Sequence, residues 1–332
     1  MLHRLIGITV IAISFAVAWL MMDYGEFSDT PLDLPPEGAT YNLAPGTSFK
    51  GLAGELDQKG WISNALYLRI MARLDGSAAK IKAGEYHIAK GTTPRDLLAL
   101  FVSGKVTQYS LTIVEGWSFR QMLSAIQANE FLKHTLEGLP DEEIMKRLGH
   151  EGEHPEGRFL PDTYHFPRGT TDLDFLKRAY NALQKRLAAE WEGRAEKLPL
   201  KTPYEALILA SIIEKETGIA SERAEIAGVF VRRLRKGMKL QTDPTVIYGM
   251  GERFDGNIRR RDLKEDTPYN TYVHRGLTPT PICLPGADAI HAALHPADGK
   301  SLYFVADGSG GHKFSNTLKE HNAAVRKYQL KK

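Results

Sequence analysis

Two carboxylates, Glu214 and Glu216, stand at the end of a segment that the sequence predicts to be a helix. The segment covers residues 204–217, is rich in apolar residues and contains neither glycine nor proline. Glu216 follows Ile212 by four positions and Ile213 by three, so on a helix it lies over the apolar face. Burial against apolar groups disfavours the charged form of a carboxyl and raises its pKa. The spacing therefore predicts a general acid that holds a proton near neutral pH.

Glu214 occupies a different face of the same predicted helix. It follows Ala210 by four positions and Ser211 by three, which is a smaller and more polar surface. We expect Glu214 to contact a ligand rather than to donate the proton. The alternative is that both carboxylates lie on a solvated helix end and have no chemical role.

The residues that follow could form one wall of a groove. A second predicted helix, from Arg223 to about Lys239, places Ile226, Val229 and Phe230 on one face. Pro244 then predicts that residues 241–245 form a polar loop. A groove of this kind suits a polymeric substrate. The opposite face of the second helix is expected to be basic, with Arg223, Arg232, Arg233, Arg235 and Lys236.

The same residues resemble those of the endolytic murein transglycosylase family, also called YceG-like. The resemblance rests on Ala-Ser-Ile-Ile-Glu-Lys-Glu-Thr at 210–217 and on Leu-Gln-Thr-Asp-Pro-Thr-Val-Ile-Tyr-Gly at 240–249. It continues through 268–272, 276–282 and 303–314, and it covers nearly the whole chain. It implies a lyase that cuts the MurNAc–GlcNAc β-1,4 bond inside peptidoglycan strands, including strands being synthesised, and leaves a 1,6-anhydro-MurNAc end. It also implies cell-wall synthases as partners.

The resemblance and the local chemistry together predict the site. Glu216 is the expected catalytic acid and base, and no cofactor is expected. Two tyrosines, an amide and a hydroxyl at 269–272 suit a sugar ring and its acetamido group, through stacking and hydrogen bonds. The residues predicted to bind substrate are Glu214, Gln241, Thr242, Asp243, Tyr248, Tyr269, Asn270, Thr271, Tyr272, His312 and Phe314.

Two other functions are compatible with these residues. Most glycoside hydrolases use two carboxylates, at about 5 Å in retaining and about 6.5–9.5 Å in inverting enzymes. Asp243 could supply the second carboxylate, which would make the protein a muramidase-type hydrolase. A membrane protein that only binds peptidoglycan would need no desolvated carboxyl. The position of Glu216 argues for chemistry, and the product would separate a transglycosylase from a hydrolase.

Composition excludes several other classes. A chain of 332 residues exceeds the usual size of one core and predicts at least two domains. The formal net charge is +3, which gives no reason to expect nucleic acid as a partner. The single cysteine, Cys283, excludes an intrachain disulfide and a cysteine-rich metal site. His295, His312 and His321 do not show metal-ligand spacing, so no metal site is expected.

The N-terminus predicts a membrane anchor. Residues 5–22 contain no charged side chain, and a spanning helix needs roughly 20 apolar residues. Arg4 precedes this stretch, whereas Asp23 and Glu26 follow it, which favours a body outside the cytoplasm. The alternative is a cleaved signal peptide, because residues 16–18 read Ala-Val-Ala. We expect a single-pass protein of the bacterial cytoplasmic (inner) membrane with its catalytic domain on the periplasmic side.

The predicted fold class is α+β, with four segments along the chain. Residues 1–22 form the anchor, 23–37 a polar, proline-rich linker, 38–108 a small module, and 109–332 a mixed α/β catalytic domain with the Glu216 helix. Strand-to-helix joints at Gly46 and Gly91, each followed by hydroxyl residues, bracket a strand–helix–helix–strand order. This order resembles a LysM-like module, which implies glycan binding; the alternative is a packing platform without a ligand.

Overall fold

The computed structural model describes residues 2–330 and divides the chain into two compact units. The first unit comprises Met1–Tyr109 and His165–Gly169, and the second comprises Ser110–Tyr164 and Thr170–Lys332. Residues 1 and 331–332, the outer ends of the predicted anchor and catalytic domain, lie outside the described residues. Within the described part, helices dominate and the strands form short two-stranded sheets, so the fold is a mixed α and β structure.

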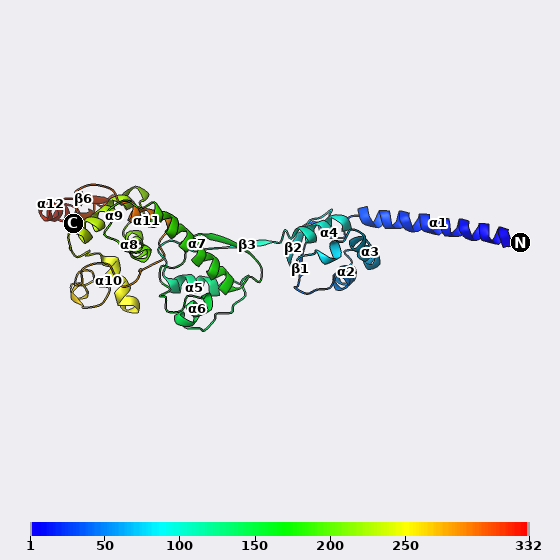
Figure 1. The fold of residues 1–332 in the computed structure, drawn as a ribbon, viewed down its shortest axis with the longest axis horizontal. Coiled ribbons are helices and arrows are strands. Elements are labelled where there is room, and N and C mark those ends of the chain that lie inside the picture. The colour runs from blue at the N-terminus through cyan, green and yellow to red at the C-terminus, as the bar shows by residue number, and fades with distance from the viewer. Residues whose placement is uncertain (1, 331–332) are drawn as a thin grey trace. The chain divides into compact units, whose positions relative to one another are not determined.

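Helix α1, Leu2–Asp29, extends from the first unit as one continuous helix (Figure 1). Its most apolar stretch has a mean hydropathy of 2.4, and none of that stretch is buried. A helix of this length and composition can cross a membrane. These properties fit a single-pass anchor, and a signal sequence shares them.

The linker expected at residues 23–37 is not a free segment. Helix α1 continues to Asp29 instead of ending at residue 22. Phe27, Leu32 and Leu34 are buried in the core of the first unit. The backbone N–H of Leu32 also donates to the carbonyl of Thr92 at 2.8 Å. The apolar residues between the prolines pack into the core of the first unit. The polar, proline-rich composition of the segment did not predict this contact.

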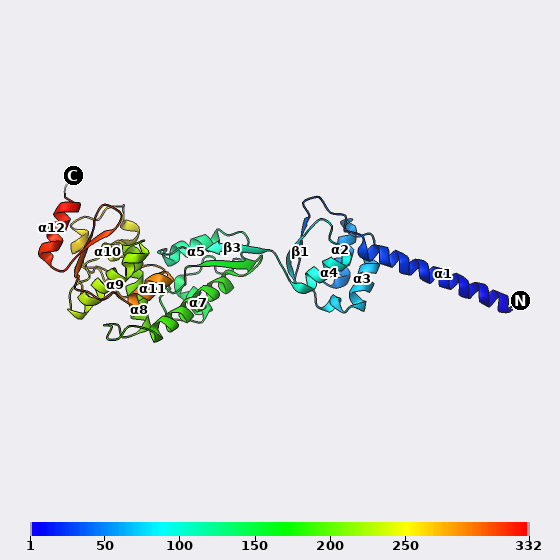
Figure 2. The ribbon, with the colours of Figure 1, turned by 90° about the horizontal axis from the view of Figure 1, so that it is seen from above.

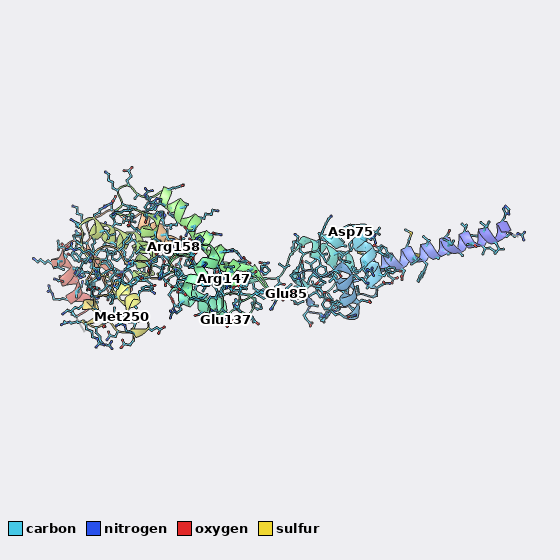
Figure 3. The ribbon with its side chains drawn as sticks, turned by 60° about the horizontal axis from the view of Figure 1, so that its bottom comes forward. Asp75, Glu85, Glu137, Arg147, Arg158 and Met250 are labelled. Carbon is cyan, nitrogen blue, oxygen red and sulfur yellow. The ribbon has the colours of Figure 1, made fainter. Side chains whose placement is uncertain are left out.

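The first unit contains the strand–helix–helix–strand order expected from its capped joints. Strands β1 and β2 pair antiparallel, with Tyr41 opposite Tyr86. Ser48 and Thr93 cap the helices that follow the two joints. Glu85, labelled in Figure 3, is buried and accepts from Arg168 at 2.7 Å. The elements are β1 (Ala39–Leu43), α2 (Phe49–Gln58), α3 (Ala65–Leu74), η1 (Ser77–Ala79), β2 (Gly84–Ile88) and α4 (Pro94–Ser103).

The second unit surrounds a buried helix, α8. Arg158, labelled in Figure 3, pairs with Glu153 at 3.3 Å and lies 4.3 Å from the ring centre of Tyr204 in α8. Strand β3 pairs with β4, and β5 pairs antiparallel with β6. Strands β3 (Gln108–Thr112) and β4 (Thr163–Pro167) each have residues in both units. The elements wholly in the second unit are α5 (Phe119–Gln127), α6 (Asp141–Leu148), α7 (Asp172–Glu192), α8 (Pro203–Glu216), α9 (Ala220–Arg235), α10 (Asp243–Met250), η2 (Gly251–Arg253), η3 (Asp262–Lys264), α11 (Ala287–Leu294), β5 (Tyr303–Ala306), β6 (His312–Ser315) and α12 (Leu318–Tyr328).

Helix α8 is enclosed on every side rather than along one stripe. All eight residues of 206–213 are buried, because α7, α9, α10 and α11 pack around the helix. The side chain of Glu214 is only 7% exposed. Glu214, expected on a smaller and more polar face, therefore has polar partners, Arg223 and the N–H of Gly286, but is nearly as enclosed as the rest of the helix. The helix pattern was correct, but the number of neighbouring helices decides how far each face is buried.

Helix α10 begins inside the segment expected to be a loop. Asp243 is its first residue, and Pro244 occupies the first turn. Proline is tolerated there because the first-turn N–H groups have no partner within the helix. Of the expected loop, only Gln241 and Thr242 remain outside a helix, and they lead directly into α10.

Candidate active site

A cleft of about 540 Å³ opens at the C-terminal end of α8. Its walls come from α8, α9, the start of α10, β5, β6 and α12, and Figure 2 shows α8, α9, α10 and α12 gathered in one part of the second unit. Elements far apart in the sequence therefore meet around one carboxyl. The predicted residues that line the cleft are Glu216, Gln241, Thr242, Asp243, Tyr272 and His312.

Glu216 is the last residue of α8 and its carboxyl is desolvated. Burial raises the pKa of Glu216 to about 6, and the negative charge of Asp243 acts in the same direction. The hydroxyl of Thr242 donates to Oε1 of Glu216 and lowers the pKa, as do the charges of His312 and Arg233. The balance leaves a carboxyl that exchanges its proton near neutral pH, as the sequence predicted for this side chain.

Arg233 is a buried cation in the cleft wall. Its Nε donates to the carbonyl of Leu302 at 2.6 Å, and its Nη1 donates to the carbonyl of Leu240 at 2.8 Å. Nη1 also lies 3.3 Å from Oε1 of Gln241. Burial lowers the pKa of Arg233, although a guanidinium keeps its charge at any ordinary pH. Arg233 thus joins the loop before α10 to the segment before β5.

Gln241 holds an unusual backbone conformation at the mouth of the cleft. Its φ is +54°, in the left-handed region that costs a side-chain-bearing residue about 1–2 kcal/mol. Its N–H donates to the carbonyl of Thr271 at 3.2 Å. Such strain persists where neighbouring contacts impose it, and it is concentrated at functional sites. The turn places Thr242 beside Glu216.

Asn270 and Thr271 do not line the cleft; Thr271 bonds the Gln241–Thr242 loop, and Asn270 bonds the segment that carries Thr271. Both are buried, at 1% and 3% exposure. Nδ2 of Asn270 donates to the carbonyl of Glu265 at 2.7 Å, and its Oδ1 accepts from the N–H of Tyr272 at 2.9 Å. Oγ1 of Thr271 accepts from the N–H of Thr242 at 3.1 Å. The predicted sugar-binding motif therefore contributes Tyr272 to the cleft and uses its polar pair for positioning.

Asp243 and Tyr272 form a hydrogen-bonded pair in the cleft lining. The hydroxyl of Tyr272 donates to Oδ1 of Asp243 at 2.6 Å. Burial and this hydrogen bond raise the pKa of Tyr272, so its proton stays on the phenol. Asp243 is exposed and contributes to raising the pKa of Glu216. The second carboxylate that a hydrolase would need is thus present in the same cleft.

His312 is held by a second acidic residue, Glu222. The N–H of His312 donates to Oε1 of Glu222 at 2.9 Å, and its Nδ1 lies 2.8 Å from Oε2. The charge of His312 also lowers the pKa of Glu216. Phe314 lies outside the cleft lining and packs beside Phe304, with ring centres 6.0 Å apart.

Glu214, Tyr248 and Tyr269 lie apart from the residues that line the cleft. Oε2 of Glu214 accepts from the N–H of Gly286, the cap of α11, at 2.9 Å. The rings of Tyr248 and Tyr269 contact edge to face at 4.9 Å. Tyr248 also donates to Oε2 of the buried Glu156 at 3.3 Å, so the two tyrosines belong to a separate packing group.

Several cleft residues were missed from the sequence. Arg233 was assigned to the basic face, yet it follows Phe230 by three positions and Val229 by four, which places it on the apolar face. The spacing argument that singled out Glu216 would have found it. Tyr303 and His321 stack with ring centres 5.2 Å apart. Phe304, Asn322 and the other residues of α12 carried no local signal.

The chain is similar to known proteins over most of its length. The YceG-like family matches residues 41–327. An endolytic murein transglycosylase of Bacillus subtilis is 33% identical over 304 residues, which cover 86% of this chain and 84% of the relative. An endolytic murein transglycosylase of Streptococcus pneumoniae is 27% identical over 329 residues, 87% of this chain and 58% of the relative.

A solved structure gives the same result. The crystal structure of a yceG-like protein of Listeria monocytogenes is 30% identical and aligns with a TM-score of 0.55. The alignment covers 87% of this chain and 99% of that protein. Sequence and fold therefore agree over most of the length, and the chain belongs to the YceG-like family.

Proposed function

We propose that this chain is an endolytic lytic transglycosylase that cuts the β-1,4 bond between MurNAc and GlcNAc inside peptidoglycan strands. The observation that carries the proposal is the carboxyl of Glu216, which lines a cleft and has its pKa raised to about 6 by burial. A carboxyl with such a pKa can donate a proton and then accept one. Family membership and the names of the relatives favour the same reaction.

The reaction needs one acid and base group. Protonated Glu216 donates to the glycosidic oxygen while the bond from that oxygen to the anomeric carbon breaks, and GlcNAc leaves with a free 4-hydroxyl. The Glu216 carboxylate then takes the proton of the MurNAc C6 hydroxyl, whose oxygen attacks the anomeric carbon. This closes a 1,6-anhydro ring and restores the protonated acid. Because the nucleophile belongs to the substrate, its effective concentration is high without a bound water.

Neighbouring groups prepare Glu216 for both steps. Thr242 donates to Oε1, so the transferable proton resides on Oε2. The carboxylate of Asp243, oriented by Tyr272, can stabilise the positive charge that develops on the sugar ring. Desolvation makes these electrostatic effects larger than they would be in water.

The cleft favours a catalyst over a protein that only binds peptidoglycan. Binding alone requires no carboxyl with a raised pKa, and keeping Glu216 partly out of water destabilises its charged form. Asp243 keeps hydrolysis as the second candidate, because it could activate a water molecule. Hydrolysis and transglycosylation cut the same bond and differ in the new MurNAc end.

The setting proposed for the enzyme follows from α1. As a single-pass anchor it would hold the second unit on the extracytoplasmic side of the cytoplasmic membrane, where strands under synthesis are the nearest substrate. Cell-wall synthases are the partners that this setting suggests.

The first unit, with its strand–helix–helix–strand order, is proposed as a LysM-like module that retains glycan. Deleting residues 38–108 should then slow cleavage of long strands more than of short fragments, whereas equal slowing would indicate a folding role.

The product decides between the candidates. Purified full-length protein is incubated with isolated glycan strands, and the fragments are analysed by mass spectrometry with and without borohydride reduction. A transglycosylase yields MurNAc ends that are one water lighter than hydrolysis products and resist reduction. Reducible MurNAc ends would overturn the proposal in favour of hydrolysis with Asp243. Intact strands, from protein with the circular dichroism of a folded chain, would favour binding alone.

A further inference from the structure

Outside the cleft, three potential metal ligands converge where α7 and α11 end. Glu190 lies in the last turn of α7, His291 in the last turn of α11, and His295 directly after α11. Their ligand atoms all lie within 4.8 Å of one another. Figure 1 shows α11 near α7, and the two helices are in contact. The proposed glycan chemistry uses none of these three residues.

The distances among the three side chains suit a small cation. Nδ1 of His291 lies 2.8 Å from Oε2 of Glu190, and Nε2 of His295 lies 3.5 Å from the same oxygen. Zinc binds imidazole nitrogen and carboxylate oxygen at about 2.0–2.2 Å, so its tetrahedral ligands stand roughly 3.3 Å apart. The two observed separations bracket this value. The imidazole rings are stacked, with centres 4.3 Å apart, and need to rotate so that both nitrogens point at one ion.

The side chains have room for this rotation. The side chain of His291 is 55% exposed and that of His295 is 31% exposed, whereas Glu190 is 14% exposed. Histidines four positions apart occupy one face of a helix end and are a common pair of zinc ligands. The spacing is visible in the sequence between His291 and His295, whereas His295, His312 and His321 lie too far apart to show it.

The carboxylate has a supporting partner of the kind that metal sites use. Nη2 of Arg186 pairs with Oε1 of Glu190 at 3.0 Å, which leaves Oε2 directed at the histidines. Groups that hold a ligand in place from behind raise metal affinity. We propose that Glu190, His291 and His295 bind one divalent transition metal ion, with Zn²⁺ as the best fit and water as the fourth ligand.

The consequence of binding would be structural. The ion would join the end of α7 to the end of α11, next to the hydrogen bond from the N–H of Ala195 to the carbonyl of Leu294 at 2.9 Å. Helix α11 packs against α8 through the main core of the second unit. An ion that binds only the folded chain stabilises it in proportion to the logarithm of its concentration. The site would thus stabilise the support of the Glu216 helix without taking part in the reaction.

The test uses full-length protein in detergent, purified without a polyhistidine tag and dialysed against a chelator. ZnCl₂ is titrated by calorimetry, and Co²⁺ is added separately so that visible absorption reports on coordination by nitrogen and oxygen. We expect one Zn²⁺ per chain. His291→Ala and Glu190→Gln should each weaken binding by more than ~10-fold, because losing a ligand costs more than losing a supporting group. Zinc should also raise the melting temperature of the unsubstituted chain but not of these variants.

His274→Ala is the matched control. His274 is similarly exposed, at 49%, and also pairs with a carboxylate, Asp266, at 2.6 Å, but it lies outside the convergent group. This variant should bind Zn²⁺ like the unsubstituted chain. The proposal is overturned if the unsubstituted chain binds no Zn²⁺ above micromolar background. It is equally overturned if His291→Ala, with an unchanged melting temperature in chelator, binds as tightly as His274→Ala.

Discussion

The hydroxyl of Thr242 donates a hydrogen bond to Oε1 of Glu216, and it comes from a loop that Thr271 holds in place with Gln241 in a strained conformation. The contact opposes the burial that raises the pKa of Glu216 to about 6. One hydroxyl thus limits how far the acid departs from an ordinary carboxyl. Its effect can be measured because Val has nearly the shape of Thr and lacks the donor.

Thr242→Val should move the pH dependence of cleavage to higher pH. Without the donor, the charged form of Glu216 loses a stabilising contact, so its pKa rises further above about 6. A general acid must carry its proton, and the activity that falls as this proton is lost should therefore persist to a higher pH. The measurement is kcat/KM for glycan strands between pH 4 and 9. Thr245→Val, which removes a buried hydroxyl bonded to Thr242 but not to Glu216, should leave the profile in place.

Glu216→Gln should abolish most of the activity. Glutamine keeps the shape of the side chain but cannot transfer the proton, and general acid–base catalysis contributes roughly 10²–10⁴-fold. Turnover of glycan strands is compared with that of Glu214→Gln, whose altered group accepts from Gly286 beside α11. Near-normal turnover by Glu216→Gln, together with an inactive but folded Glu214→Gln, would show that the wrong carboxyl had been chosen.

Arg233→Lys should destabilise the second unit by roughly 2–3 kcal/mol, because the carbonyls of Leu302 and Leu240 lose charge-assisted donors that lysine cannot replace together. Urea unfolding gives this difference directly. Arg235→Lys on the same helix is the control, since Arg235 makes one exposed contact to the carbonyl of Lys197. Equal losses from the two variants would contradict the buried role of Arg233.

Glu156 should make stability depend on pH. Burial raises the pKa of Glu156 to about 7, against hydrogen bonds from Phe119 and Tyr248 that lower it. The folded chain therefore holds this proton more tightly than the unfolded chain does. The stability that results is complete below about pH 4.5 and is lost as the pH rises through about 7.

Glu156→Gln should remove this dependence. Each unit of pKa corresponds to ~1.4 kcal/mol, so the variant should gain on the order of 3 kcal/mol over the unsubstituted chain between pH 5 and pH 8. Urea unfolding at the two pH values gives the difference. The exposed Glu137→Gln, at a position labelled in Figure 3, should show no such gain. A Glu156→Gln variant that loses stability at pH 8 would refute the direction of the shift.

Sequence spacing predicted the position of a side chain where that position depends on one helix. It did not predict positions that depend on contacts between several segments. Glu216 was found because its apolar neighbours are three and four positions away, and the same rule applied to Arg233 would have succeeded. Asn270 and Thr271 were expected to meet a sugar because amide and hydroxyl groups suit one. Their partners include backbone groups of Glu265, Tyr272 and Thr242, and composition does not reveal which backbone groups need a side-chain partner.

The cleft walls also contain residues that are distant from Glu216 in the sequence and could not be predicted from it. Tyr303 and His321 reach the cleft from β5 and α12, 87 and 105 residues after Glu216 in the chain. Nothing in their local patterns distinguishes them from packing residues. The resemblance to a known family identified the chain. The substrate contact expected for Glu214 stays a prediction, and the structure shows that carboxylate accepting from the cap of α11.

Helix α1 runs into the first unit without interruption, so a membrane-spanning α1 would hold that unit close to the bilayer. Beyond the apolar stretch the helix has only residues 23–29, which rise about 10 Å at 1.5 Å per residue. Asp23 is already tied to the first unit, because the hydroxyl of Tyr67 donates to its Oδ2 at 2.6 Å. With α1 in a bilayer, the first unit would lie beside the lipid headgroups. It could not reach peptidoglycan layers farther from the membrane. If the first unit binds glycan as proposed, that glycan would be newly made strand close to the membrane surface.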